Sequence, residues 1–259
     1  MKIGVFDSGL GGLSVLQHLQ TALPEASFLY IADSVNAPYG DKTNDFIAER
    51  SLAISQFLLA QQVSAIVVAC NTATAAAVQL LRNQSPVPVV AIEPALKPAA
   101  SRSLRKKIGV LATESTLRSE KYQLLMSRVA DTVSCYQQAA HGLAEQVEAG
   151  AIEDAATREL LNQYLQPMLE HGIDTLVLGC THYPFLIPVI RQLVGNEITI
   201  VDTGRAVSEQ LVRVLADTKQ SAMHEKPQHH FFSSGDVQHA GRMIALLLGE
   251  QVNVASLEV

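Results

Sequence analysis

Two short segments near the beginning of the chain recur, in the same order, in its second half. Residues 2–8 read KIGVFDS and residues 107–113 read KIGVLAT, an offset of 105 residues. Residues 66–72 read IVVACNT and residues 176–182 read LVLGCTH, an offset of 110 residues. Because the order is kept and the two offsets nearly agree, the matches indicate an internal duplication rather than a chance likeness between apolar strands. The sequence therefore predicts two similar halves.

Short apolar runs alternate along the chain with longer segments of helical periodicity. Continuous apolar strands separated by helices are typical of parallel sheets that are covered on both faces. The predicted fold class is α/β, with two similar parallel-sheet α/β domains related by a pseudo-twofold axis and an active site in the cleft between them. Strands are expected at residues 2–6, 28–32, 65–69, 87–92, 107–111, 132–136, 175–178 and 198–201, and helices within 43–61, 114–129 and 154–170.

The duplication also suggests where the domains divide. We predict that the first α/β domain spans residues 1–95 and is completed by residues 210–259, and that the second spans residues 96–209. The crossing point is expected at residues 93–105, which contain two prolines and a basic tail. Residues 219–228 are expected to form a polar surface loop.

Composition and charge exclude several classes of partner. A formal net charge of -6 argues against a nucleic-acid partner, which requires a basic face. The chain opens directly on a strand pattern rather than a signal peptide, and no apolar run approaches the roughly 20 residues that span a bilayer. We therefore expect no membrane association and a cytoplasmic location, where thiols stay reduced. The three cysteines are widely spaced and lack a Cys-x-x-Cys pair, which argues against a disulfide framework or a zinc cluster.

The cysteines at residues 70 and 180 occupy equivalent places in the repeat. Ligands of parallel α/β sheets bind beyond the carboxyl ends of the strands, and both residues follow an apolar strand there. Each precedes an expected helix, whose N-terminus favours a thiolate. A lone free cysteine is usually a small buried hydrophobic residue, but two at equivalent positions favour a chemical role. Cys135 has no such counterpart and is interpreted as structural.

The glycine-rich segment after the first strand could be a phosphate-binding loop. Gly9-x-Gly11-x-x-Ser14 nearly matches the dinucleotide fingerprint, and Asp33 follows at about the spacing of the ribose-binding acid. Two features argue against that interpretation, since the third position is serine and Asp7 at the strand end would repel a pyrophosphate. A carboxylate there suits a substrate ammonium group or a proton relay to a thiol, and the alternative is that Asp7 caps the following helix.

Other polar residues admit both a functional and a structural interpretation. Tyr39 lies in a turn-rich loop and could cover a small ligand or simply pack on the surface. His182 and Cys180 alone are weak support for a metal site, so His182 more reasonably tunes the thiol or shuttles its proton. Glu148 would ordinarily be a solvated residue at a helix end. The adjacent His229 and His230 are interpreted as structural.

Taken in order, these motifs resemble those of the glutamate racemases. The matching segments are DSGLGG at 7–12, PYG at 38–40, CNTA at 70–73, LAT at 111–113 and GCTHYP at 179–184, and the likeness extends from Asp7 to Asp202. The wider aspartate/glutamate racemase superfamily shares the paired cysteines but not all of these flanks. One departure is that Cys135 precedes Tyr136, where the family commonly has proline.

The resemblance implies two α/β domains, with the C-terminal segment packing on the first, and proton transfer at Cα by Cys70 and Cys180, assisted by Asp7 and His182. It also suggests that Cys70 deprotonates D-glutamate and Cys180 L-glutamate, although the residues themselves leave this assignment open. Glu148 corresponds to a further acid. The implied substrate contacts are Asp7, Ser8, Pro38, Tyr39, Gly40, Asn71, Thr72, Thr113, Thr181 and His182.

The activity implied by the resemblance is cofactor-independent interconversion of L- and D-glutamate, which supplies D-glutamate for bacterial peptidoglycan. No lysine in a Schiff-base setting and no metal-binding motif suggests a cofactor, and the expected partner is the small molecule glutamate. The sequence does not fix the oligomeric state, and a homodimer is compatible with it. Some family members carry an N-terminal extension associated with activation by a cell-wall precursor. This sequence has none, so no such activation is expected.

Three alternatives remain open from the sequence. The chain could racemise aspartate or another small amino acid. It could be a nucleophilic hydrolase that uses Cys180 and His182, which would leave Cys70 unexplained. It could also be an amino-acid-binding protein without catalysis, in which the cysteines are incidental.

Overall fold

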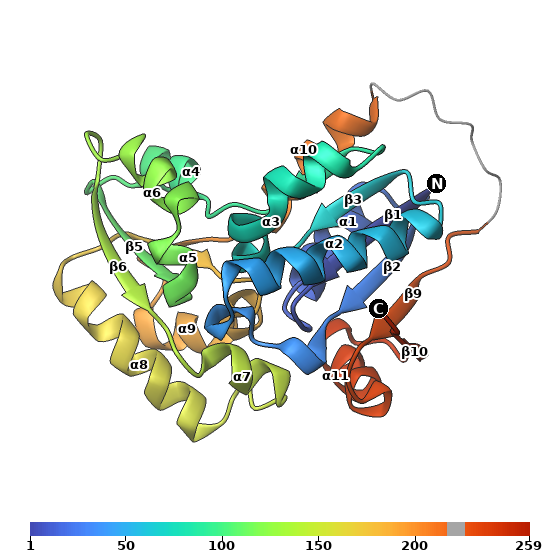
Figure 1. Cartoon of the computed structure of the whole chain (residues 1–259). Helices are drawn as coiled ribbons and strands as arrows, with labels where there is room; N and C mark the ends of the chain where they lie inside the picture. The colour runs from blue at the N-terminus through green and yellow to red at the C-terminus, as the bar shows by residue number, and fades with distance from the viewer. Residues whose placement is uncertain (217–225) are drawn as a thin grey trace. The chain divides into compact units, whose positions relative to one another are not determined.

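The computed structural model describes residues 1–216 and 226–259, so most of the expected loop at 219–228 lies outside the described residues. The chain divides into two compact units (Figure 1). The first unit comprises Met1–Ile92 and Gly204–Val259, and the second comprises Glu93–Thr203. Within the described ranges, no helix is both long enough and apolar enough to cross a bilayer.

The first unit contains a six-stranded sheet in the order β10-β9-β2-β1-β3-β4, in which all neighbouring strands run parallel. The central strands are almost entirely buried, which explains their continuous apolar sequences. The strands are β1 (Lys2–Asp7), β2 (Ser27–Ala32), β3 (Ala65–Val68), β4 (Val89–Ala91), β9 (His230–Ser233) and β10 (Val254–Ser256).

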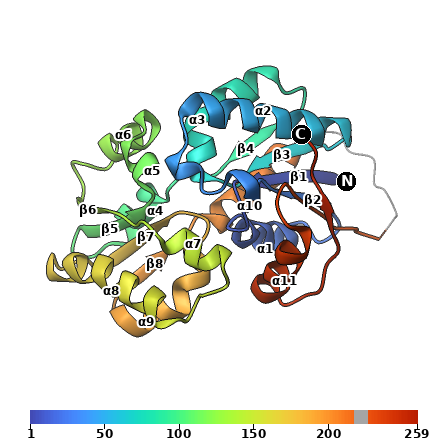
Figure 2. The same ribbon diagram turned by 60° about the horizontal axis from the view of Figure 1, so that its bottom comes forward.

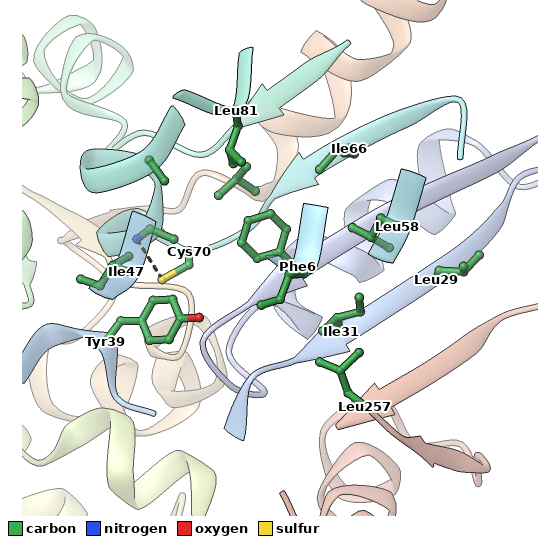
Figure 3. Close-up of a cluster of buried hydrophobic side chains, with 14 of the residues drawn as sticks. Phe6, Leu29, Ile31, Tyr39, Ile47, Leu58, Ile66, Cys70, Leu81 and Leu257 are labelled. Carbon is green, nitrogen blue, oxygen red and sulfur yellow. Dashed lines mark hydrogen bonds between the residues drawn. The ribbon is translucent and has the colours of Figure 1, made fainter. Parts of the chain in front are cut away.

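Helices cover both faces of this sheet. Helices α2 and α3 lie on one face, and α1, α10 and α11 lie on the other (Figure 2). The face under α2 and α3 holds a cluster of buried side chains that includes Phe6, Ile31 and Leu58 (Figure 3). Each such side chain contributes about 1.5–3 kcal/mol by leaving water. The helices are α1 (Leu13–Ala22), α2 (Asn44–Ala60), α3 (Asn71–Gln84), α10 (Gly204–Ala216) and α11 (Val237–Leu248), with 3-10 turns η1 (Ser34–Asn36) and η2 (Tyr39–Asp41).

The second unit contains a four-stranded parallel sheet in the order β6-β5-β7-β8. A separate buried cluster joins β5 and β7 to α4 and α6 and includes Ala99, Val110 and Tyr122. The strands are β5 (Lys107–Ala112), β6 (Ser134–Ala139), β7 (Thr175–Gly179) and β8 (Thr199–Val201). The helices are α4 (Leu96–Arg102), α5 (Glu114–Arg118), α6 (Glu120–Ser127), α7 (Leu143–Glu148), α8 (Ala155–Glu170) and α9 (Ile187–Val194), with a 3-10 turn η3 (Tyr183–Leu186).

The two sheets confirm the predicted α/β class. The order β2-β1-β3-β4 in the first unit corresponds strand for strand to β6-β5-β7-β8 in the second. The repeated segments coincide with equivalent strands, because residues 2–8 and 107–113 contain β1 and β5. Likewise, residues 66–72 and 176–182 contain the ends of β3 and β7. The first sheet differs by the two additional strands β9 and β10 beside β2.

Two segments differ in detail from the expected elements. The amphipathic segment 114–129 is helical but contains two helices, because the backbone of Ser119 is extended and its side chain caps the second helix by accepting the N–H of Tyr122 at 3.2 Å. Serine readily makes such a cap, which competes with helix continuation. The strand expected at 132–136 runs instead from Ser134 to Ala139. It is an edge strand, so its polar residues are tolerated where a central strand would be apolar.

Candidate active site

Both cysteines of the repeat lie at the switch point of their own sheet. In the first unit the chain passes from β1 to β2 on one side and then to β3 on the other, so the crossovers diverge between β1 and β3. Asp7 ends β1, and Cys70 follows β3. In the second unit Thr113 follows β5, and Cys180 follows β7. Open α/β sheets bind ligands at this kind of position.

The sulfur of Cys70 caps helix α3. Cys70 is the N-cap residue, and its sulfur accepts the N–H of Ala73 at 3.4 Å, drawn as a dashed line in Figure 3. The residue is buried in the same apolar cluster as Tyr39. A helix N-terminus and a donated N–H both stabilise negative charge on the sulfur. The sequence-based expectation of a cysteine at a helix N-terminus therefore matches the geometry.

Asp7 and Ser8 form a polar group beside this sulfur. Ser8 Oγ lies 3.7 Å from Cys70 Sγ and 3.4 Å from Asp7 Oδ1, which are both long contacts. The fully buried Asp7 carboxylate also accepts the N–H groups of Ser8 at 2.8 Å and Gly12 at 2.5 Å. Asp7 thus holds its own glycine-rich loop while lying near the thiol. The structural and functional interpretations of this aspartate do not exclude each other.

Gly12 is required by this packing. A Cβ atom at Gly12 would lie 2.8 Å from Asp7 Cβ, 2.9 Å from the hydroxyl oxygen of Tyr30 and 3.1 Å from Ala69 Cβ. All three neighbours are buried and cannot move away cheaply. We expect Gly12→Ala to lower the free energy of unfolding by about 1–3 kcal/mol, measured by urea denaturation.

Gly241→Ala is the matched control. Its Cβ would meet only ordinary van der Waals contacts at 3.8 Å, and the residue lies inside helix α11. Alanine is the better helix former by about 0.5–1 kcal/mol, so this variant should be no less stable than the wild type. Equal stability of the two variants would show that the Asp7 loop is not tightly packed.

In the second unit, Cys180, His182 and Glu148 form a thiol–imidazole–carboxylate chain. Cys180 Sγ lies 3.5 Å from His182 Nδ1, and His182 Nε2 lies 2.6 Å from Glu148 Oε1. The histidine is buried, and the Glu148 side chain is 22% exposed at the end of α7. Glu148 is therefore not the solvated helix-end residue that its local sequence suggests. Across the described residues, no group of three or more His, Cys, Asp or Glu side chains is arranged to hold a metal ion.

The hydrogen-bonded Cys180–His182–Glu148 group controls the charge of the histidine. Burial by itself lowers the pKa of His182, but the hydrogen bonds to Cys180 and Glu148, together with their charges, raise that pKa well above its usual value. The imidazole therefore holds a proton near neutral pH. A protonated imidazole at 3.5 Å can donate a hydrogen bond from Nδ1 to the Cys180 sulfur.

Tyr39 is held by a buried ion pair that the sequence did not reveal. Its hydroxyl donates to Asp33 Oδ2 at 2.6 Å, and Asp33 also pairs with Arg50 through contacts of 2.8 and 3.0 Å. The Asn36 amide donates to the same carboxylate at 3.1 Å. Since Tyr39 is 1% exposed, its side chain is neither surface packing nor a loose lid. Its neighbours Pro38 and Gly40 are half-buried.

Asp33 stays ionised in this setting. Burial by itself raises the pKa of Asp33, but hydrogen bonds from Arg50, Tyr39 and Ser234 outweigh it and lower the pKa below its usual value. In the sequence, Asp33 was considered only for its spacing from the glycine-rich loop, as part of a dinucleotide fingerprint that other features argued against, so its pairing with Arg50 and Tyr39 was not predicted.

The remaining predicted contacts follow the carboxyl ends of β3, β5 and β7. Asn71 follows Cys70, and both of its buried side-chain amide atoms have no hydrogen-bond partner among the described residues. Thr72 and Thr181 are buried at the starts of the segments after β3 and β7. Thr113 caps α5 by accepting the N–H of Thr116 at 3.2 Å.

Residues that were interpreted as structural have ordinary partners. Cys135 lies half-buried on the edge strand β6, and burial raises its pKa to about 11, so the thiol stays neutral. His229 lies against Phe28 with a ring-centroid distance of 5.6 Å, and its Nδ1 accepts the Phe28 N–H at 3.3 Å. Neither residue contributes to the groups around Cys70 and Cys180.

Comparison with known proteins gives a consistent result. A family model described as Asp/Glu/Hydantoin racemase matches residues 3–211. The chain is 49% identical to a glutamate racemase of Ectopseudomonas mendocina over 253 residues, which cover 97% of this chain and 96% of that protein. It is 50% identical to a glutamate racemase of Ralstonia nicotianae over 248 residues, with 96% and 90% covered.

Solved structures agree with these relatives. The crystal structure of glutamate racemase isoform RacE1 from Bacillus anthracis has a TM-score of 0.87 at 32% identity and covers 99% of this chain and 97% of that chain. The Escherichia coli glutamate racemase, solved in complex with L-glutamate and an activator, has a TM-score of 0.88 at 30% identity, with 98% and 97% covered.

Proposed function

Because the chain belongs to the Asp/Glu/hydantoin racemase family, and within it to the glutamate racemases, we propose that it interconverts L- and D-glutamate by proton transfer at Cα between the thiols of Cys70 and Cys180. The observation that carries this proposal is the duplicated topology. Each unit presents one thiol at the switch point of a parallel sheet with the same strand order.

Racemisation requires two proton-transfer groups. A weakly acidic Cα proton must leave one face of the substrate, and a proton must return to the opposite face. A single base would have to cross the molecule between the two steps. Two thiols that act on one Cα avoid this, provided that one begins as thiolate and the other as thiol. Their roles then exchange for the opposite enantiomer.

Different neighbouring groups assist proton transfer by each thiol. We propose that His182 stabilises and reprotonates Cys180, with Glu148 holding the imidazole. Cys70 relies on the α3 N-terminus and on Ser8 and Asp7. This asymmetry arises because Thr72 stands in the first unit at the position that His182 occupies in the second.

The substrate carboxylates and ammonium group need polar partners. The Asn71 amide has unused hydrogen-bonding capacity beside Cys70, which suits a charged substrate group. Helix N-terminal amides add further donors for carboxylates. The proposed substrate contacts are Asp7, Ser8, Pro38, Tyr39, Gly40, Asn71, Thr72, Thr113, Thr181 and His182.

We propose that the reaction uses no cofactor, because the two thiols supply both the acid and the base. The product D-glutamate would serve peptidoglycan synthesis. The Cys180–His182–Glu148 chain by itself would also suit a nucleophilic hydrolase. That alternative leaves Cys70 without a role, so racemisation is favoured.

Polarimetry tests the proposal directly. With L-glutamate, the optical rotation should decay to zero, and the rate should survive dialysis against a chelator and treatment with a carbonyl trap. Constant rotation would exclude racemisation of glutamate. Decay with L-aspartate but not L-glutamate would identify a sister racemase, and loss of activity restored by pyridoxal phosphate or zinc would overturn the two-thiol chemistry.

The His182–Glu148 pair predicts a pH dependence of stability. Because the contacts with Cys180 and Glu148 raise the folded-state pKa of His182, their contribution is fully present below the ordinary histidine pKa of about 6.5 and is lost as the pH rises through the raised value. In this window the unfolding free energy should fall by up to about 1.4 kcal/mol per pH unit from this group. Urea denaturation of Glu148→Gln should show a shallower fall.

Glu145→Gln provides the control for this measurement. It lies on the same helix α7 but is exposed, so its curve should follow that of the wild type. Parallel curves for the wild type and Glu148→Gln would show that Glu148 does not hold the proton on His182.

A further inference from the structure

One buried hydroxyl in the second unit has no part in the mechanism above. Tyr183 directly follows His182 and is fully buried. Its hydroxyl donates to the backbone carbonyl of Ala140 at 3.0 Å. The same hydroxyl also hydrogen-bonds to the Cys180 side chain. A buried tyrosine hydroxyl that donates to a well-placed backbone carbonyl fixes the relative position of two segments.

The two segments joined by this bond carry the two ends of the imidazole–carboxylate contact. Tyr183 begins the η3 turn just after His182. Ala140 follows β6, and helix α7 begins three residues later and ends at Glu148. The bond therefore links the turn that follows His182 to the segment just before helix α7, which carries Glu148.

Helix α7 needs such a link. It has six residues, and a helix this short is not stable by its own hydrogen bonds. Its direction must be set by tertiary contacts, which include the packing of Leu143 and Val147, the 3.2 Å hydrogen bond from Thr157 to the Gln146 side chain and the bond at Ala140. The Glu148 side chain at the end of this helix is 22% exposed, and its carboxylate lies 2.6 Å from His182 Nε2.

The hydroxyl also keeps its proton. Burial raises the pKa of Tyr183 well above its usual value, and the nearby Cys180 raises it further. The hydroxyl therefore keeps its proton and donates to the Ala140 carbonyl at neutral pH.

We propose that Tyr183 is a positioning residue that holds helix α7 so that Glu148 reaches His182, and thereby sets the proton affinity of the group that serves Cys180. This inference deepens the proposed function and rests on it for its catalytic consequence. The structural consequence, the placement of Glu148 against His182, does not depend on which substrate the protein uses.

The test compares Tyr183→Phe with Tyr164→Phe. The Tyr164 hydroxyl donates at 3.0 Å to the very next carbonyl, that of His141, from the partly exposed helix α8. Both variants lose one hydroxyl that is bonded to the segment between β6 and α7, but only Tyr183 is adjacent in sequence to His182. NMR titration of the histidine side chains in the full chain should show the His182 pKa lowered in Tyr183→Phe and unchanged in Tyr164→Phe.

Steady-state kinetics should distinguish Tyr183→Phe from Tyr164→Phe in the same way. Tyr183→Phe should lower kcat by roughly 10- to 100-fold with little change in KM, because it displaces a proton-transfer group rather than a binding group. In the double variant Tyr183→Phe/Glu148→Gln, kcat should fall no further than in Glu148→Gln alone, since both changes break one contact. Tyr164→Phe should keep the wild-type kcat.

The possible outcomes are distinct. An unchanged His182 titration in folded Tyr183→Phe would overturn the inference, whatever the activity. Additive kinetic losses in the double variant would also overturn it. Should Tyr183→Phe be too unstable in buffer, the titration in sucrose, which favours the compact state, gives the same comparison. Failure of the wild type to racemise glutamate would instead defeat the proposed function and leave the NMR result standing.

Discussion

Replacing either Cys70 or Cys180 with serine should lower the rate of racemisation by about 10²- to 10⁴-fold in both directions, because each direction needs one thiol as base and the other as acid. Serine is the informative replacement. It keeps the N-cap function of Cys70 at α3 while removing an acidic thiol. Cys135→Ser is the matched control, since that thiol is neutral and lies on an edge strand, and its activity should equal that of the wild type.

Exchange of the Cα proton with D₂O distinguishes the roles of the two thiols. In D₂O, product formed by the wild type from either enantiomer should carry deuterium at Cα, and substrate recovered early should carry little. Each serine variant should still exchange the Cα proton of the one enantiomer whose base remains. By the family resemblance, Cys180→Ser should exchange D-glutamate and Cys70→Ser should exchange L-glutamate. Substantial racemisation by Cys180→Ser would refute the two-base mechanism.

The α/β class and the equivalent cysteines could be predicted from local pattern. Central parallel strands are buried on both faces, so their sequences are continuously apolar and their ends are marked by the first polar residue. That is why the segments 2–8 and 107–113 located β1 and β5. The same logic placed Cys70 and Cys180 after β3 and β7.

Contacts between distant segments could not be predicted in this way. Arg50 stands 17 residues from Asp33 on an amphipathic helix, where a charged residue ordinarily faces water. Its pairing depends on how α2 packs over β2, which no local pattern encodes. Glu148 is similar, because 34 residues separate it from His182 and only the family resemblance suggested a role. Edge strand β6 was misplaced because an exposed strand need not be apolar.

The buried Asp33–Arg50 pair predicts the largest loss of stability. Asp33→Ala should lower the free energy of unfolding by about 3–5 kcal/mol, measured by urea denaturation, because it leaves the partly buried Arg50 charge and the Tyr39 hydroxyl without their acceptor. The loop 38–40 loses its anchor as well, so KM for glutamate should rise in any protein that remains folded.

Two comparisons show whether burial is the cause. Asp33→Ala/Arg50→Met removes both charges, so it should be more stable than Asp33→Ala alone. Glu209→Ala breaks a pair with Arg205 of the same 2.8 Å separation, but both side chains are exposed, and its unfolding midpoint should match that of the wild type. If Asp33→Ala were no less stable than Glu209→Ala, the ion pair would not anchor the loop, and the placement of Tyr39 would depend on its apolar contacts with the cluster around Cys70.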